Sequence, residues 1–133
     1  MAFITWKKDY EVGYAKVDEQ HKELVNIINQ LAEAMEKGKG KDELGKVLHF
    51  LANYTVSHFK TEEDLMLAGA YPGYPGHKKI HTDLLTQVGE LVTKFDAGKS
   101  VLTVQVMTFL QDWLIKHIQG EDVKLAGFLN RKP

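Results

Sequence analysis

Apolar residues recur along this chain at spacings of three and four, which is the periodicity of an amphipathic α-helix. The first stripe of this kind includes Leu24, Ile28 and Leu31. It begins after Asp18, an acceptable N-cap, and stops at the Gly-Lys-Gly sequence of residues 38–40. The pattern therefore predicts a first helix between these two points.

Three further stripes predict three further helices: one over about 42–68, one from 75 or 76 to 98, and one from 100 to beyond 118. Residues 71–76 read Tyr-Pro-Gly-Tyr-Pro-Gly and cannot be helix interior, because proline lacks a backbone donor and glycine loses too much backbone entropy. Short connections return the chain antiparallel. The sequence therefore predicts an all-α fold, an up-down-up-down antiparallel four-helix bundle.

The N-terminal residues carry scattered aromatic side chains without helical periodicity. We expect them to form an arm that packs along the bundle, with Trp6 and Tyr10 burying apolar area. A chain of 133 residues is expected to form one domain. We therefore predict a single domain over 1–133, with the arm at 1–17 and the helical bundle at 18–130.

Histidines and an acid lie on the apolar stripes at helical spacing. His58 and Glu62 are four residues apart, as are His77 and His81, so each pair projects from a single helix face. His21 continues the apolar stripe of the first helix. A buried ionised carboxylate such as Glu62 is costly unless it gains a cation or a proton, so this pattern favours a metal.

The last predicted helix carries His117 and Asp122, which are five positions apart. On a regular helix this spacing is ~140° out of phase at ~100° per residue, so both could face one metal only if the helix were irregular. We therefore expect a widened turn eased by Gly120, after which the chain continues helically through Leu125 and Phe128.

The predicted topology gathers these candidates at one end of the bundle. The starts of odd helices and the later parts of even helices share an end, and each candidate obeys that rule. The predicted cluster comprises His21, His58, Glu62, His77, His81, His117 and Asp122. His49, nine residues before His58, is half a turn out of phase with it and is expected to face away. A metal-free structural bundle is the plain alternative, but it would leave two acids buried without cations.

Composition narrows the kind of metal. The absence of cysteine excludes thiolate zinc sites, iron–sulfur clusters, disulfides and thiol nucleophiles. Seven ligands exceed the four of a tetrahedral zinc site, and the excess of histidine argues against calcium and magnesium. Two six-coordinate transition metals with two bridging carboxylates and a bridging oxygen would leave one of twelve positions open for a small ligand.

The charge balance indicates no particular class of binding partner. The chain has 17 basic and 18 acidic residues and a formal charge of −1, so it has no electrostatic footprint for nucleic acid or an anionic membrane. It also has no run of 18 apolar residues and no apolar core of a signal peptide. We expect a cytoplasmic protein that does not insert into membranes and, with no apolar surface patch legible, a monomer.

The ligand series His21, His58-x-x-x-Glu62, His77-x-x-x-His81 and His117-x-x-x-x-Asp122 resembles the hemerythrin signature over nearly the whole chain. The flanking sequences match too: Asp-Glu-Gln-His, His-Phe-Lys-Thr-Glu-Glu, Gly-His-Lys-Lys-Ile-His and Trp-Leu-Ile-Lys-His-Ile. The resemblance implies a non-haem di-iron centre, oxo- or hydroxo-bridged, that binds O2 reversibly.

The resemblance also implies how the residues divide. One iron would take the three histidines matched by His77, His81 and His117, and the other would take His21 and His58. Glu62 and Asp122 would bridge the two irons, with O2 at the open position of the second. Leu114, one turn before His117, matches the leucine of the family's O2 pocket.

The function implied is that of a soluble oxygen carrier or store and not an enzyme, with O2 as ligand and an O2-consuming enzyme as the recipient. Three alternatives use the same ligands: an oxygen or redox sensor acting in trans, an enzyme that handles peroxide or nitric oxide, and an iron store. Ferritin-like oxidases are disfavoured because they need Glu-x-x-His pairs, whereas the only acid three positions before a histidine is Asp18, before His21.

Overall fold

The structure, a computed structural model, describes residues 3–131, so the first two residues of the predicted arm and residues 132–133 lie outside it. Its helices are α1 (Ala15–Glu36), α2 (Lys41–Ala68), α3 (Tyr74–Asp96), α4 (Val104–His117), the π-helical turn η2 (Ile118–Asp122), α5 (Val123–Arg131) and a short 3-10 turn η1 (Lys8–Tyr10). Residues 3–131 contain no strand. None of their helices combines the length and apolar character needed to cross a membrane.

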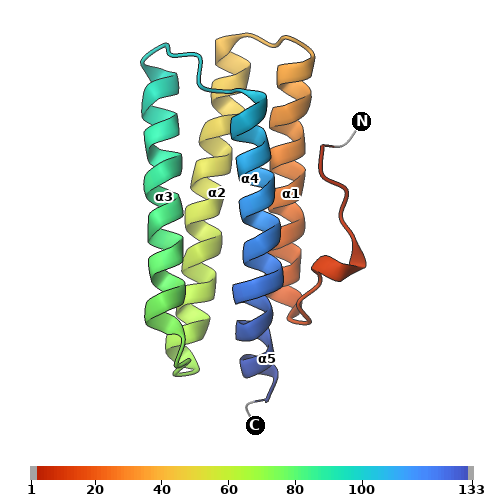
Figure 1. The fold of residues 1–133 in the computed structure, drawn as a ribbon, viewed down its shortest axis with the longest axis vertical. Helices are drawn as coiled ribbons and strands as arrows, with labels where there is room; N and C mark the ends of the chain where they lie inside the picture. Colours follow the sequence, from red (N-terminus) through yellow and green to blue (C-terminus); the bar gives the residue numbers. More distant parts are fainter. Residues whose placement is uncertain (1–2, 132–133) are drawn as a thin grey trace.

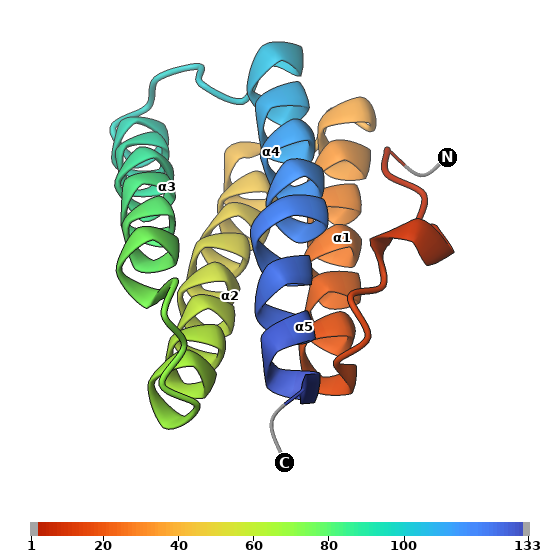
Figure 2. The ribbon, with the colours of Figure 1, turned by 60° about the horizontal axis from the view of Figure 1, so that its bottom comes forward.

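The four long helices form an up-down-up-down bundle, which confirms the predicted fold class (Figure 1). Helices α1 and α3 run in one direction and α2 and α4 in the other, while α5 continues α4 beyond η2. Helix α1 packs against α2 and α4, and α2 packs against α3 (Figure 2). The beginnings of α1 and α3 therefore lie at the same end as the later parts of α2 and α4.

The core forms where the predicted stripes meet, and Leu24, Ile28 and Leu31 of α1 are buried as the pattern indicates. On α2 the predicted stripe runs through Leu48, Leu51 and Thr55 to His58 and Glu62, and the structure also buries Phe59 and Met66 beside it. Helix α2 packs against two neighbours, and a helix with two partners buries a wider face than a single row of residues.

Helix α1 begins at Ala15, earlier than the predicted start at Asp18. Asp18 lies within the first turn, where its carboxylate accepts hydrogen bonds from the backbone N–H groups of Val12, at 2.7 Å, and Gly13, at 3.2 Å. The acid therefore does not cap the helix. It holds the segment that leads into the helix. The residue type alone could not distinguish this role from that of a helix cap.

Helix α4 also begins at a different residue from the predicted one. Thr103, and not Ser100, is the N-cap, because its side-chain oxygen accepts a hydrogen bond from the N–H of Val106 at 3.2 Å. Helix α3 begins at Tyr74, with Pro75 in its first turn as proline's fixed φ allows.

The N-terminal arm lies along α1 (Figures 1 and 2). The backbone of Ile4 makes two hydrogen bonds with the Asn29 side chain: its N–H donates to Oδ1 at 2.7 Å, and its carbonyl accepts from Nδ2 at 2.8 Å. Trp6 packs against the core and meets the edge of Tyr10 at 5.6 Å between ring centroids. Both rings thus bury apolar area, as predicted.

The predicted irregularity between His117 and Asp122 is confirmed, because residues Ile118–Asp122 form a π-helical turn. A π-helical turn inserts one extra residue into the helix, so positions five apart return to the same face. Gly120 does not have a positive φ, and a Cβ there would meet nothing within 4 Å. Neither sterics nor φ therefore requires a glycine at this position of the turn.

Replacing Asn29 with alanine should release the arm. The backbone N–H and carbonyl of buried Ile4 would lose their partners, so we expect the free energy of unfolding to fall by about 1–3 kcal/mol. Urea unfolding and amide hydrogen exchange at Ile4 would measure the effect. Asn26→Ala, at an exposed position of the same helix, is the matched control and should change stability by less than about 0.5 kcal/mol. Equal losses in the two variants would show that Asn29 does not hold the arm.

Candidate metal centre

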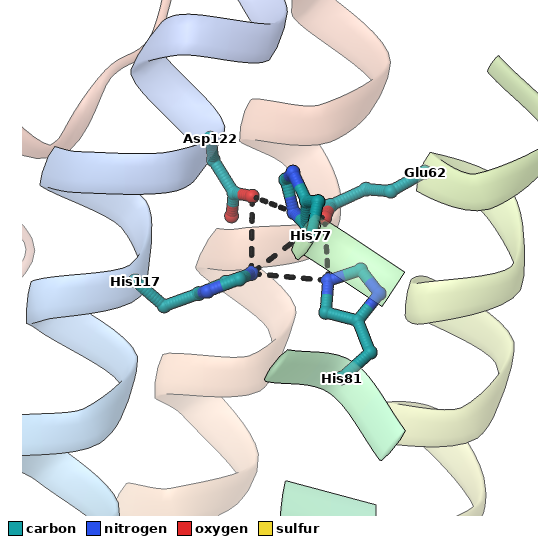
Figure 3. A group of neighbouring side chains, drawn as sticks. All are labelled: Glu62, His77, His81, His117 and Asp122. Atoms are coloured by element: carbon teal, nitrogen blue, oxygen red, sulfur yellow. Dashed lines mark hydrogen bonds and ion pairs between the residues drawn. The ribbon is translucent and has the colours of Figure 1, made fainter. Parts of the chain in front are cut away.

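Seven charged or titratable side chains meet at one end of the bundle. Helix α1 supplies His21, α2 supplies His58 and Glu62, α3 supplies His77 and His81, and the segment from α4 through η2 supplies His117 and Asp122. Each of these residues is at most 5% exposed. The structure thus brings together every residue of the predicted cluster, five of which appear in Figure 3.

Glu62 lies between two sets of histidines and turns one oxygen toward each. Its Oε1 lies 3.2 Å from Nε2 of His77 and 3.1 Å from Nε2 of His81. Its Oε2 lies 2.8 Å from Nε2 of His58 and 3.3 Å from Nε2 of His21. The carboxylate is therefore shared by both sets.

Asp122 divides its oxygens in the same way. Its Oδ1 lies 3.1 Å from Nε2 of both His77 and His117, and its Oδ2 lies 2.8 Å from Nε2 of His21. The two acids thus separate a three-histidine set, His77, His81 and His117, from a two-histidine set, His21 and His58. Every histidine of both sets directs its Nε2 atom inward.

Burial and the neighbouring side chains shift the pKa values of these groups in opposite directions. Burial alone would lower the pKa values of His21, His77 and His117, but the carboxylates of Asp122 and Glu62 outweigh it and raise each pKa to about 9. Burial and the charge of Glu62 would raise the pKa of Asp122, but the histidines lower it to about 2. The histidines likewise hold the pKa of Glu62 well below its ordinary value, against burial. The site therefore favours two anions surrounded by positive charge.

The donor atoms fit metal ions better than they fit one another. The Nε2 atoms of His81 and His117 face each other at 3.0 Å, so two lone pairs would repel unless a proton or a cation lay between them. Two nitrogens bound to one metal at ~2.1 Å and at right angles lie ~3 Å apart, which matches this distance. The buried Nε2 atoms of His58 and His77 lie 2.8–3.2 Å from carboxylate oxygens, yet neither atom has a partner with hydrogen-bond geometry among residues 3–131.

Two aromatic rings pack against the histidines. Phe59 stacks on His81 with ring centroids 3.8 Å apart and an interplanar angle of 1°, and Trp113 stacks on His117 at 4.6 Å and 16°. Trp113 lies on the apolar stripe of the last predicted helix, which predicts core packing for it, whereas no sequence pattern gives Phe59 a role. The signal for the tryptophan was its position four residues before His117, which places both on one face of α4.

Two polar residues contact the outer nitrogens of the histidines and were missed in the sequence. Oε1 of Gln20 lies 2.7 Å from Nδ1 of His58, and Oε2 of Glu63 lies 3.0 Å from Nδ1 of His81. Their positions directly before His21 and directly after Glu62 could have identified both as candidates. His49, by contrast, is exposed and pairs with Asp96 at 2.9 Å, away from the cluster as expected.

An apolar cavity of about 30 Å³ lies beside the cluster, since the rings that stack on His81 and His117 form part of its wall. Leu114 lines it, together with Leu24 and Ile28. This volume exceeds the ~10–15 Å³ that one water molecule occupies by the same measure. Among the described residues that line it, none has an ionisable side chain.

Comparison with known proteins agrees with this geometry. A family model described as the hemerythrin HHE cation binding domain matches residues 12–129. The bacteriohemerythrin of Stenotrophomonas maltophilia is 33% identical over 126 residues, which cover 95% of this chain and 81% of that protein. The bacteriohemerythrin of Methylococcus capsulatus is 36% identical over 130 residues, which cover 96% of each chain. A crystal structure of wild-type hemerythrin matches with a TM-score of 0.91 and 32% identity, over 96% of this chain and 98% of that one. As the sequence resemblance predicted, this chain belongs to the hemerythrin family.

Proposed function

We propose that this chain holds two iron ions with the seven clustered side chains and binds O2 reversibly, as an oxygen carrier or store and not as an enzyme. The observation that carries the proposal is the division of the carboxylate oxygens. Glu62 and Asp122 each turn one oxygen toward the three-histidine set and the other toward the two-histidine set. An arrangement of this kind suits two metal ions that share both acids.

The residues have distinct roles in this proposal. His77, His81 and His117 would hold one iron, His21 and His58 would hold the other, and the carboxylates of Glu62 and Asp122 would be shared by both. Two iron ions held in this way would supply the electrons that O2 accepts on binding and returns on release. The protein's part is to supply neutral Nε2 donors and two negative charges, so that metal ions replace the protons favoured by the raised pKa values of His21, His77 and His117.

The surroundings of the cluster support reversible binding over turnover. An O2 molecule that has accepted electrons is discharged if a general acid protonates it further, so a reversible site must exclude acids and water. The cavity beside the histidines is apolar, and its lining residues in the described chain have no ionisable side chain. Leu114 lies on the wall of this cavity, and we assign to it the role of shielding bound O2.

The partners that we propose for the protein follow from the chemistry of O2 binding alone. O2 is the ligand, and an O2-consuming enzyme is the recipient we expect. The names bacteriohemerythrin and hemerythrin are those of the relatives and of the solved structure. Their similarity supports a di-iron oxygen-binding protein, and the monomeric state remains a prediction.

Oxygen titration of the iron-loaded, anaerobically reduced protein tests the proposal directly. We expect a visible absorption band to appear as O2 is added, to disappear when O2 is removed, and to return in repeated cycles without net oxidation. Absorption spectra, with ferrous iron determined after each cycle, would follow this. Irreversible oxidation at the first exposure would contradict a carrier and would favour an oxidase, a peroxide-handling enzyme or an iron store.

Replacing His58 with alanine tests the assignment of the ligands. The two-histidine set would lose half of its nitrogen donors, so bound iron should fall below two ions per chain, while the fold persists in circular dichroism. His49→Ala is the matched control, because this exposed histidine lies on the same helix and pairs only with Asp96 in the described structure. Iron should stay at two ions per chain in the control. An unchanged iron content in His58→Ala would remove His58 from the site.

A further inference from the structure

The five clustered histidines differ in what their outer nitrogens contact. Within residues 3–131, the buried Nδ1 atoms of His21, His77 and His117 have no hydrogen-bond partner. His58 and His81 do have partners, and these differ in charge: the neutral amide oxygen of Gln20 lies 2.7 Å from Nδ1 of His58, and the carboxylate of Glu63 lies 3.0 Å from Nδ1 of His81.

The contact of Glu63 leads outward to a second charge. Its Oε1 accepts a hydrogen bond from the ammonium group of Lys78 at 2.9 Å, while Oε2 faces His81. The exposed fraction of the side chains rises along this series, from 0% at His81 to 17% at Glu63 and 48% at Lys78. The carboxylate is therefore held between a buried imidazole and a half-exposed cation, and these two partners fix its orientation.

The outer contact of His58 stays neutral. The amide nitrogen of Gln20 donates to the Thr61 hydroxyl at 3.3 Å, so the Gln20 oxygen is free to accept from the imidazole. Because both Nε2 atoms point into the cluster, Nδ1 is the atom that carries the proton once a metal is bound. The three-histidine set thus has a charged acceptor beside Nδ1 of His81, and the two-histidine set has an uncharged acceptor beside Nδ1 of His58.

From these contacts we infer that Glu63 is a positioning residue that makes the two halves of the metal centre electronically unequal. An anion that accepts from Nδ1–H raises the basicity of the imidazole, and a charge-assisted hydrogen bond is about twice as strong as a neutral one. Through His81, Glu63 stabilises the more oxidised state of iron in the three-histidine set. Gln20 gives no such charge to the two-histidine set, and Lys78 moderates the effect of Glu63. The inference rests on the iron-binding function proposed above.

Three substitutions should move the reduction potential with a predicted sign. Glu63→Gln keeps an acceptor oxygen for His81 but removes the charge, so the potential should rise. Gln20→Glu adds an anion beside His58, and Lys78→Gln removes the cation that moderates Glu63, so each should lower the potential. In a titration with dithionite and redox mediators, each iron takes one electron from ferric to ferrous. We expect at least a tenfold change in that equilibrium for Glu63→Gln, which is about 59 mV for one electron.

Metal affinity gives a second readout for the same variants. Residues that orient a metal-bound histidine typically contribute ~10–100-fold to affinity, so Glu63→Gln should bind ferrous iron less tightly by a factor in this range. Competition with a chelator under anaerobic conditions would measure it. Two exposed pairs supply matched controls of equal charge change. Asp64 lies next to Glu63 and pairs with Lys60, so Asp64→Asn is the control for Glu63→Gln. Lys79 lies next to Lys78 and pairs with Asp83, so Lys79→Gln is the control for Lys78→Gln. Neither control should alter potential or affinity.

The outcomes separate this inference from the proposed function. A wild-type protein that binds no iron would overturn the proposed function and this inference together. Variants that bind two irons but keep the wild-type potential, or that all shift in one direction, would overturn the inference alone, because a merely structural role cannot produce opposite signs. The same holds if the surface controls shift the potential as much as Glu63→Gln does.

Discussion

Glu62 and Asp122 carry negative charge into the buried interior of the bundle, where their side chains are at most 1% exposed, and the other features of the site respond to those two charges. An ionised carboxylate is stable in such a place only with cations and hydrogen-bond donors around it. Five imidazole nitrogens point at these acids, and the acids raise the pKa values of three of the rings, those of His21, His77 and His117, which favours positive charge there. Metal ions satisfy the same demand, and they do so without leaving lone pairs facing one another.

The fold meets this constraint by geometry that follows from chain topology. Antiparallel neighbours bring the start of one helix beside the end of the next, so short ligand spacings on separate helices converge at a single level of the bundle. The π-helical turn then solves a local problem, since it returns Asp122 to the face of His117. Aromatic rings close the site from the side: Phe59 and Trp113 stack on histidines and also line the apolar cavity.

Much of this arrangement could be predicted because helical periodicity and ligand spacing are local properties of the sequence. The need for an irregular turn before Asp122 followed from angles alone. Features that depend on neighbouring segments were harder to predict. Asp18 resembles a helix cap in isolation, yet it binds the backbone of the arm. Gln20 and Glu63 resemble ordinary surface residues, because their contacts with histidines depend on how α1 and α3 lie against α2.

The most direct test of the account is X-ray diffraction from crystals of the iron-loaded protein at wavelengths on both sides of the iron absorption edge. Anomalous difference maps locate iron independently of any assumption about the ligands. The account predicts two peaks, one beside the three-histidine set and one beside the two-histidine set, with the carboxylates of Glu62 and Asp122 between them. A single peak, or peaks away from these acids, would contradict the account.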